Sequence, residues 1–254
     1  ERWIRDSGIS YIGSGKYQIE AAALPGLTLS ALPNFSGENP YGDIEVRAVS
    51  QEIDGDQATS ELWRVTINAK PVEDGFASWN PSTTATEQDN ESMGSGVSFS
   101  SVADFALSDN DGSEEVLNYT FDLSNLIGDA GIQLRLQSLT KNTGADLDDL
   151  IMDYLDGTFS YNPANGDITV QPFDITGVAL RPQLFLDSNQ DFSIPVTASL
   201  RDTAIIDGKT ITVEKIESSS LSVNLVGQAD IPTVFANSVT GNSDVLLPIE
   251  LGGE

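Results

Sequence analysis

The segment Ser108-Asp-Asn-Asp-Gly-Ser-Glu114 carries the residue types that bind a hard cation. Asp109, Asp111 and Glu114 supply carboxylates, a neighbouring asparagine supplies an amide, and Gly112 lets the chain fold back on itself. Because Ca²⁺ prefers a shell of oxygen ligands, the segment predicts a calcium site. In the alternative interpretation, Asp109 and Asp111 form Asx turns that bond the chain's own amides, although a simple turn gives Glu114 no role.

Other acidic residues gather where consecutive modules of a tandem array would meet. Two short linkers are acidic, Glu87 stands near a predicted first strand, and an alternating string of oxygen ligands follows later in the chain. If modules stack end to end, these groups can converge on one ion that stiffens the joint. Each residue taken singly could equally be a solvated surface charge. The additional candidate ligands are Glu73, Asp74, Glu87, Asp187, Asn189, Asp191 and Asp230.

The composition is strongly acidic. The 254 residues include 39 Asp and Glu but only 12 Lys and Arg, for a formal net charge of -27. Nucleic acid is excluded as a partner because phosphate binding needs clustered basic side chains, and anionic membrane surfaces are disfavoured for the same reason. Such an excess of carboxylates destabilises the compact state through self-repulsion, so bound divalent cations are a direct remedy.

The chain has no cysteine and no histidine. Disulfides, zinc thiolate sites and Ser-His catalytic triads are therefore excluded. A glycosidase needs two carboxyl groups across a cleft, and pairs such as Asp148 and Asp149 exist. With 39 acidic residues such pairs are expected by chance, so we expect no enzyme. No apolar run is long enough to span a membrane, and the first residues do not form a signal peptide.

The chain contains an internal repeat with a period of about 150 residues. The segment from Asp6 to Tyr11 matches the segment from Asp156 to Tyr161, and later stretches match in the same order. A self-match at one nearly constant period indicates one structural unit used repeatedly. We expect the back portion of a β-sandwich module at 1–74 and a complete module at 75–230. Residues 231–254 would be the opening strands of a further module, or a strand donated to a neighbour.

The elements that must position the acidic groups are short β-strands. Alternating apolar residues, punctuated by Gly, Asn, Asp and Pro, predict an all-β fold of antiparallel sandwiches. The predicted strands of the complete module are 96–100, 116–123, 131–137, 158–162, 167–171, 178–186, 192–200, 209–214 and 219–226. Apolar residues at helical spacing predict one inserted helix near 146–155. This helix would close an open end of the sandwich or, alternatively, grip a ligand.

The acidic linkers, the Asp-x-Asp-Gly-Ser-Glu turn before a strand and the hairpin Asn165-Gly166 resemble a known group. They are similar to the tandem immunoglobulin-like or cadherin-like modules of giant bacterial surface adhesins, which type I systems secrete. The resemblance implies that Asp109, Asp111 and Glu114 ligate Ca²⁺ and that Asp74 and Asp230 lie at joints between modules. Two features depart from that group: the complete module is longer than ordinary extender repeats, and the glycine-rich secretion repeats do not occur.

The resemblance implies an extracellular, calcium-stabilised adhesin segment on the bacterial cell surface, which acts as a stalk or presents a ligand-binding part. Its partners would be neighbouring modules of the same polypeptide or identical subunits head to tail. One alternative is a calcium-dependent module that binds a cell-surface sugar or peptide. Another is a self-assembling filament subunit that exchanges strands with its neighbours.

Overall fold

The computed structural model describes residues 8–28, 35–38, 42–88, 94–109, 111–128, 141, 144, 146–185, 190–230, 232, 234–236 and 251–253. The chain divides into two compact units. Unit 1 consists of Glu1–Ala77, Leu107–Glu115 and Leu200–Lys215, and unit 2 consists of Ser78–Ala106, Val116–Ser199 and Ile216–Glu254. The predicted strand 131–137 and the candidate ligands Asp187 and Asn189 lie outside the described residues.

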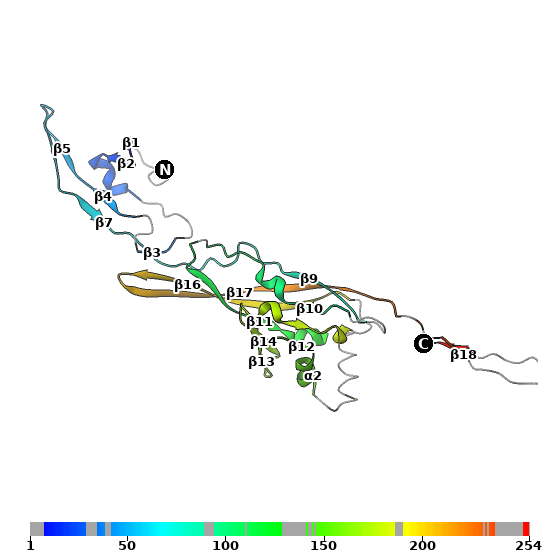
Figure 1. Ribbon diagram of the computed structural model, residues 1–254. Coiled ribbons are helices and arrows are strands. Elements are labelled where there is room, and N and C mark those ends of the chain that lie inside the picture. The colour runs from blue at the N-terminus through cyan, green and yellow to red at the C-terminus, as the bar shows by residue number, and fades with distance from the viewer. Residues whose placement is uncertain are drawn as a thin grey trace, which may run out of the picture. The chain divides into compact units, whose positions relative to one another are not determined.

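The first part of the chain forms short hairpins (Figure 1). Strand β1 pairs with β2, β3 with β8, β4 with β7 and β5 with β6, all antiparallel. The elements are β1 (Ile9–Gly13), β2 (Lys16–Ile19), the 3-10 helix η1 (Ala21–Gly26), β3 (Gly37–Glu38), β4 (Ile44–Val46), β5 (Val49–Gln51), β6 (Gln57–Thr59), β7 (Trp63–Val65) and β8 (Asn68–Ala69).

The remaining elements are mostly strands, and the last two long ones form a hairpin. They are β9 (Ser82–Thr86), β10 (Val97–Ser98), η2 (Ser100–Ala103), β11 (Glu114–Asp122), η3 (Leu123–Gly128), α2 (Leu147–Asp153), β12 (Leu155–Asp156), β13 (Ser160–Asn162), β14 (Asp167–Val170), η4 (Ile175–Gly177), β15 (Ala179–Leu180), η5 (Pro182–Phe185), β16 (Phe192–Ile206), β17 (Lys209–Val226), β18 (Val234–Ala236) and β19 (Leu251–Gly253).

Two larger sheets hold these strands. One has six strands in the order β13-β14-β11-β16-β17-β9, and the other has three in the order β10-β15-β12. The pairing of β17 with β9 is parallel, with Ser222 opposite Ser82 and Val226 opposite Thr86. Strands β18 and β19 pair with each other in a separate two-stranded sheet. The all-β class predicted from the sequence is confirmed at this level.

The core of unit 2 lies between the two larger sheets. Phe99, which follows β10, stacks on Phe121 of β11 with ring centroids 4.4 Å apart. Both side chains are fully buried, as are Ile194 of β16 and Leu221 of β17. Buried residues alternate with more exposed ones along β16 and along the end of β17, from Leu221 to Val226, which is the pattern of strands with one face on the core.

The inserted helix is present but shorter than predicted. Helix α2 covers Leu147–Asp153, with Asp146 as N-cap accepting a hydrogen bond from the amide of Asp149 at 2.9 Å. It ends early because Leu155 already belongs to β12. The turn at Gly166 has the positive φ of 76° that the sequence predicts. None of the described helices is long and apolar enough to cross a membrane.

Several strand boundaries differ from the prediction. The predicted strand 178–186 is reduced to β15, because Pro182 cannot donate to a strand ladder and opens the 3-10 helix η5. The predicted strands 209–214 and 219–226 form one continuous strand, β17. Strand β9 was not among the predicted strands; its Ser and Thr side chains give only a weak apolar alternation.

Candidate cation site

The loop that precedes β11 folds through two Asx turns. Asp109 Oδ1 accepts a hydrogen bond from the amide of Asp111 at 2.8 Å, and Asp111 Oδ1 accepts one from the amide of Ser113 at 2.8 Å. Asp111 Oδ2 also accepts from the amide of Ser36 at 3.0 Å. Gly112, with φ of 85°, allows the reversal. The Asx-turn alternative therefore describes how Asp109 and Asp111 bond in this structure.

Glu114 has a role that a simple turn does not require. It is the first residue of β11 and its side chain is buried. Its Oε1 accepts from the amide of Gly75 at 2.9 Å, and its Oε2 accepts from the amide of Asp109 at 3.4 Å. In addition, the amide of Ser108 donates to the carbonyl of Gly75 at 2.7 Å. Glu114 thus fastens the acidic linker to the loop.

Asp202 is the most isolated acidic side chain in this region. Along β16, Leu200, Asp202, Ala204 and Ile206 all lie in the row of buried residues. Asp202 is only 1% exposed, and neither of its carboxylate oxygens accepts a hydrogen bond from the described residues. Its charge acts on Asp109, so the two carboxylates are neighbours. A buried carboxylate without a partner is costly, so this position needs an explanation.

Glu73 is the fourth buried carboxylate of the group. Burial, and then hydrogen bonding to Glu114, raise its pKa to about 7, while Lys215 acts in the opposite direction. Lys215 Nζ lies 3.5 Å from Glu73 Oε2 and donates to the carbonyl of Asp74 at 3.0 Å. The Glu73 side chain is only 1% exposed, and Lys215, its ion-pair partner, is partly exposed. One lysine thus partly offsets the charge of a group of buried acids.

The pKa values of the two loop aspartates shift in opposite directions. Burial is the main effect that raises the pKa of Asp109, and the charges of Asp111 and Asp202 add to it. For Asp111, burial also acts upward, but hydrogen bonds from Ser113 and Ser36 outweigh it and lower the pKa. The hydrogen bonds therefore favour the charged form of Asp111, whereas burial and the neighbouring charges disfavour the charged form of Asp109.

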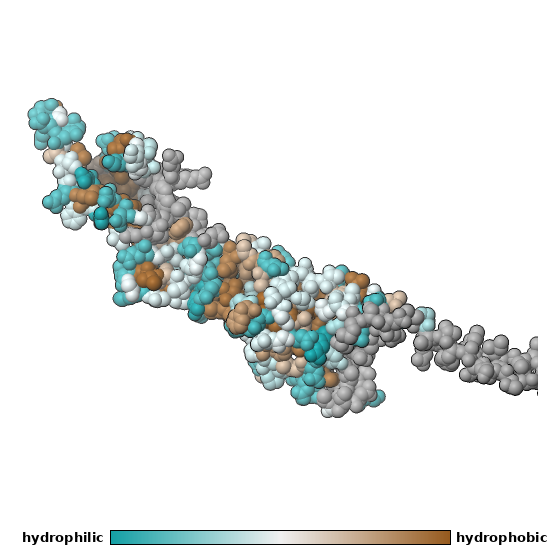
Figure 2. All heavy atoms as spheres, viewed as in Figure 1, coloured by the Kyte–Doolittle hydropathy of each residue, from teal (hydrophilic) through white to brown (hydrophobic). Residues whose placement is uncertain are grey.

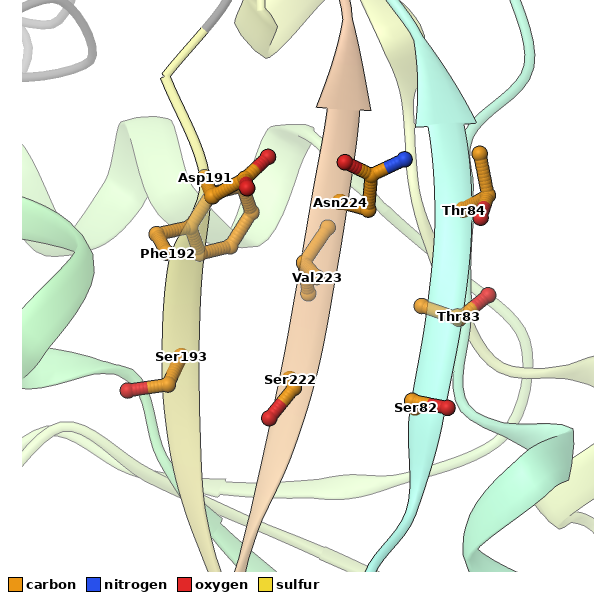
Figure 3. A pocket seen from close by; sticks show the side chains of 9 residues that line it. All are labelled: Ser82, Thr83, Thr84, Asp191, Phe192, Ser193, Ser222, Val223 and Asn224. Carbon is orange, nitrogen blue, oxygen red and sulfur yellow. The ribbon is translucent and has the colours of Figure 1, made fainter.

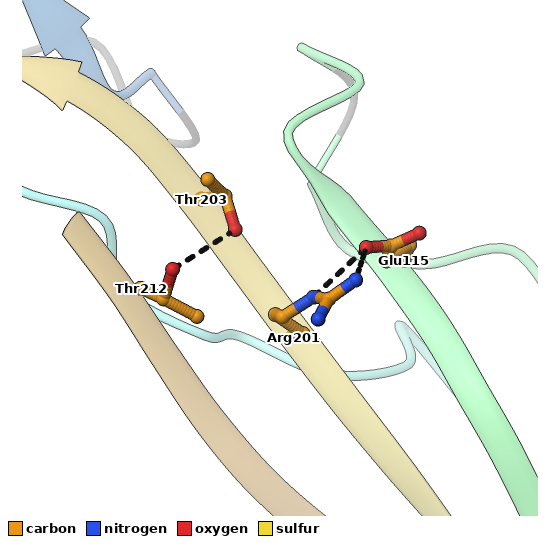
Figure 4. Close-up of polar contacts among 4 residues, drawn as sticks. All are labelled: Glu115, Arg201, Thr203 and Thr212. Carbon is orange, nitrogen blue, oxygen red and sulfur yellow. Dashed lines mark hydrogen bonds and ion pairs between the residues drawn. The ribbon is translucent and has the colours of Figure 1, made fainter. Parts of the chain in front are cut away.

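The strands around the group are tied to one another. Arg201 Nε donates to Glu115 Oε1 at 2.9 Å, which links β16 to β11 (Figure 4). The hydroxyls of Thr203 and Thr212 lie 3.5 Å apart and link β16 to β17 (Figure 4). The amide of Thr203 also donates to the carbonyl of Ser113 at 3.2 Å. The acidic loop is thus anchored beside Asp202, and all of these residues belong to unit 1.

The residues fit a calcium ion by their chemistry. All are oxygen donors, each carboxylate oxygen can accept more than one contact, and Asp202 has no other described partner. As they stand, however, no three acidic side chains of the described residues converge closely enough to hold one metal ion. Binding would therefore require the loop carboxylates to turn from backbone amides toward Asp202.

No family model matches the chain, and no curated protein matches it.

The structure gathers only part of the predicted ligand set. Asp109, Asp111, Glu114 and Glu73 lie together, and Asp74 contributes its carbonyl to Lys215 while its side chain is exposed. The remaining described candidates belong to unit 2: Glu87 accepts from the amide of Gln228, Asp191 accepts from the amide of Leu225 at 3.0 Å, and Asp230 is exposed.

Sequence reasoning missed Asp202 although a signal was available. The predicted strand stopped at residue 200, whereas β16 continues to Ile206 with unbroken alternation. Extending the period-two pattern would have put Asp202 among the inward residues, where a lone carboxylate is unusual.

A second polar feature lies on unit 2. A shallow groove of about 650 Å³ crosses β16, β17 and β9 (Figure 3). Ser193, Ser222 and Asn224 present hydroxyl and amide groups there, and the half-buried ring of Phe192 stacks on Phe185 at a centroid distance of 5.5 Å. The lining residues are Ser82, Thr83, Thr84, Asp191, Phe192, Ser193, Ser222, Val223 and Asn224.

Proposed function

We propose that the chain is a calcium-stabilised structural segment of a bacterial surface adhesin, which acts as an extracellular stalk or spacer. The observation that carries the proposal is Asp202, a carboxylate that is 1% exposed and has no described hydrogen-bond partner beside the acidic loop. A cation bound there would neutralise Asp202 and the neighbouring buried acids. Asp109, Asp111, Glu114 and Asp202 would hold the ion, with Glu73 at the margin of the site.

Calcium would act here as a structural clamp. Glu114 already joins the linker at Gly75 to the loop, and Asp202 belongs to the hairpin of β16 and β17. An ion shared by these groups would connect the linker, the loop and the hairpin. Without the ion, repulsion between their carboxylates would oppose folding. Extracellular modules typically bind calcium with Kd of about 10⁻⁴ to 10⁻³ M, which suits a site that fills outside the cell.

Two features support a spacer. The sequence repeat is typical of architectural modules. In addition, the first strand of the complete module, β9, pairs with its last long strand, β17, which closes the module on itself. Neighbouring modules or identical subunits head to tail are the proposed partners, and the resemblance to adhesin modules supports the extracellular location.

The test is thermal unfolding in calcium and in EDTA at matched ionic strength. We expect calcium to raise Tm, because a ligand that binds only the folded state stabilises it by mass action. Glu114→Gln should remove most of the increase. Glu52→Gln changes the same charge at an exposed hairpin turn and should keep the increase. Equal melting of the unaltered chain in the two solutions would reject the proposal.

The groove supports a second candidate function, the binding of a neutral glycan. Hydroxyl, amide and carboxylate groups beside a fixed aromatic ring are the side chains that recognise sugars. A glycan screen in calcium and in EDTA would test this, with Asn224→Ala as the variant, because its side chain is exposed. A spacer without this activity would bind no glycan in either solution.

A further inference from the structure

The hairpin that contains β4 and β7 has one charged and one apolar face. Val46 lies opposite Trp63, and these side chains are 47% and 71% exposed. Val65, on the same strand as Trp63, is 44% exposed. Between them, Glu45 lies opposite Arg64 and pairs with it at 3.5 Å, on the other face. Figure 2 shows hydrophobic side chains at the surface of this part of unit 1.

The internal repeat identifies the counterparts of these hairpins. In the hairpin β1–β2, Tyr11 lies opposite Tyr17, and in the hairpin β13–β14, Tyr161 lies opposite Ile168. These are the residues that the sequence repeat aligns, since Tyr11 corresponds to Tyr161 and the strand after Gly15 corresponds to the strand after Gly166. The two hairpins therefore share their register as well as their sequence pattern.

The second hairpin of each repeat corresponds in the same way. The hairpin β5–β6 turns at Ile53-Asp54-Gly55, and β16–β17 turns at Ile206-Asp207-Gly208. In the repeat, the sequence of β4 aligns with the start of β16, and the sequence of β7 aligns with the end of β17. The counterparts of the exposed residues are buried: Ile194 (for Val46) is 0% exposed, Leu221 (for Trp63) 0% and Val223 (for Val65) 2%.

The order of the six-stranded sheet shows what differs between the two copies of the repeat, the first within residues 1–74 and the second within residues 75–230. Strand β11 lies between β14 and β16, and β9 lies beyond β17. Without β11 and β9, that sheet would consist of the hairpins β13–β14 and β16–β17. Their counterparts β1–β2 and β4–β7 are two-stranded sheets, and within the described residues β4 has no strand partner except β7. Among the described residues, no strand of the first copy occupies the position that β11 fills in the second.

We propose that this open edge of β4, with the apolar face beside it, binds an extended polypeptide strand that has the alternation of β11 and comes from outside residues 1–254. In β11, Leu117, Tyr119 and Phe121 point to one side at every second position. Tyr119 is 3% exposed and Phe121 is fully buried, so this row forms core contacts in the second copy. A strand of the same chemistry would cover Val46 and Trp63 in the first copy.

Two interactions would hold the added strand on β4. A free strand edge offers backbone donors and acceptors to an added strand, and alternate side chains then set the register. Burial of apolar side chains as large as Trp63 supplies the driving force. Neither interaction involves the acidic loop, so strand binding goes beyond the proposed calcium function and is expected in EDTA as well as in calcium.

The probe is a labelled peptide with the sequence of residues 114–123, titrated into the full chain and followed by fluorescence anisotropy. We expect saturable binding and new hydrogen-exchange protection in β4. The double variant Trp63→Ser/Val65→Ser should weaken binding at least tenfold, which corresponds to about 1.4 kcal/mol. Because both side chains are already exposed, the variant should keep the far-ultraviolet circular dichroism of the unaltered chain.

Glu45→Gln is the matched control, since it alters the same hairpin on its charged face and should bind the peptide normally. A scrambled peptide without the apolar alternation should not bind. The proposal is overturned if the peptide fails to bind, or if it binds the double variant as well as the unaltered chain. It is also overturned if the chain alone associates through Trp63, because a second copy would then cover the face.

Discussion

Replacing Asp202 with Asn is the sharpest test of the proposed cation site. Asn has nearly the shape of Asp, so the change removes a charge without opening a cavity. Because the Asp202 oxygens are buried without described partners, the charge costs stability when no cation is bound. Asn stays unsatisfied at this position but carries no charge, and an unsatisfied buried charge costs more than an unsatisfied neutral group, so we expect Asp202→Asn to be more stable than the unaltered chain in EDTA by about 1 kcal/mol or more.

Calcium should reduce or reverse this difference in stability between Asp202→Asn and the unaltered chain. If Kd is about 10⁻⁴ M, calcium at about 10 mM stabilises the unaltered chain by about 2.7 kcal/mol. For a chain of this size, that corresponds to a rise in Tm of about 5–10 °C. Asp202→Asn lacks a charged ligand and should lose most of this rise. The stability difference in EDTA should therefore shrink or change sign in calcium.

The assay is calorimetry or circular dichroism at matched ionic strength. Asp207→Asn is the control, because Asp207 is exposed at the turn of the same hairpin and its φ of 52° is one that Asn tolerates. This control should keep the full calcium response. The reasoning fails if Asp202→Asn keeps the whole calcium shift, or if it is less stable than the unaltered chain in EDTA.

Three further predictions concern single side chains. The pKa of Glu73 is raised from 4.5 to about 7, so in EDTA its contribution to stability is present below about pH 4.5 and is lost as the pH rises through 7. Denaturation at several pH values should therefore show a smaller loss of stability with rising pH in Glu73→Gln than in the unaltered chain. An equal loss in both would count against the raised pKa of Glu73. Gly157→Ala should cost more than about 1 kcal/mol in urea unfolding, because φ is 106° and an added Cβ would lie 2.4 Å from the carbonyl oxygen of Gly177; a neutral effect would contradict this backbone geometry. Phe121→Ala should cost about 3–5 kcal/mol, whereas Phe173→Ala, at a residue that is 80% exposed, should change stability little; similar losses would show that Phe121 is not a core residue.

The sequence predicted the elements whose pattern is local. The alternation from residue 116 to 123 predicted β11, and the helical spacing of apolar residues near 146–155 predicted α2. Asn165-Gly166 likewise predicted a tight turn, since its conformation depends on few neighbours. The sequence also predicted an acidic turn before β11, but the hydrogen bonds of this loop to Ser36 and Gly75 join residues far apart in the sequence. Local patterns do not contain such pairings.

The misses have the same origin. Strand β9 exists because it pairs with β17, and its Ser and Thr side chains give little apolar signal of their own. Asp202 interrupts the apolar row of β16, so the predicted strand ended before it. In both cases tertiary contacts determine the strand, although the local sequence favours a strand only weakly or not at all.

The parallel pairing of β9 and β17 has a mechanical consequence. Ser82 lies opposite Ser222, and Thr86 lies opposite Val226. If tension is applied to the chain ahead of Ser82 and beyond Val226, it acts at opposite ends of this ladder. The hydrogen bonds would then resist shear together instead of opening one after another as in an unzipping hairpin. A tether under flow would gain resistance to extension from such a pair of strands.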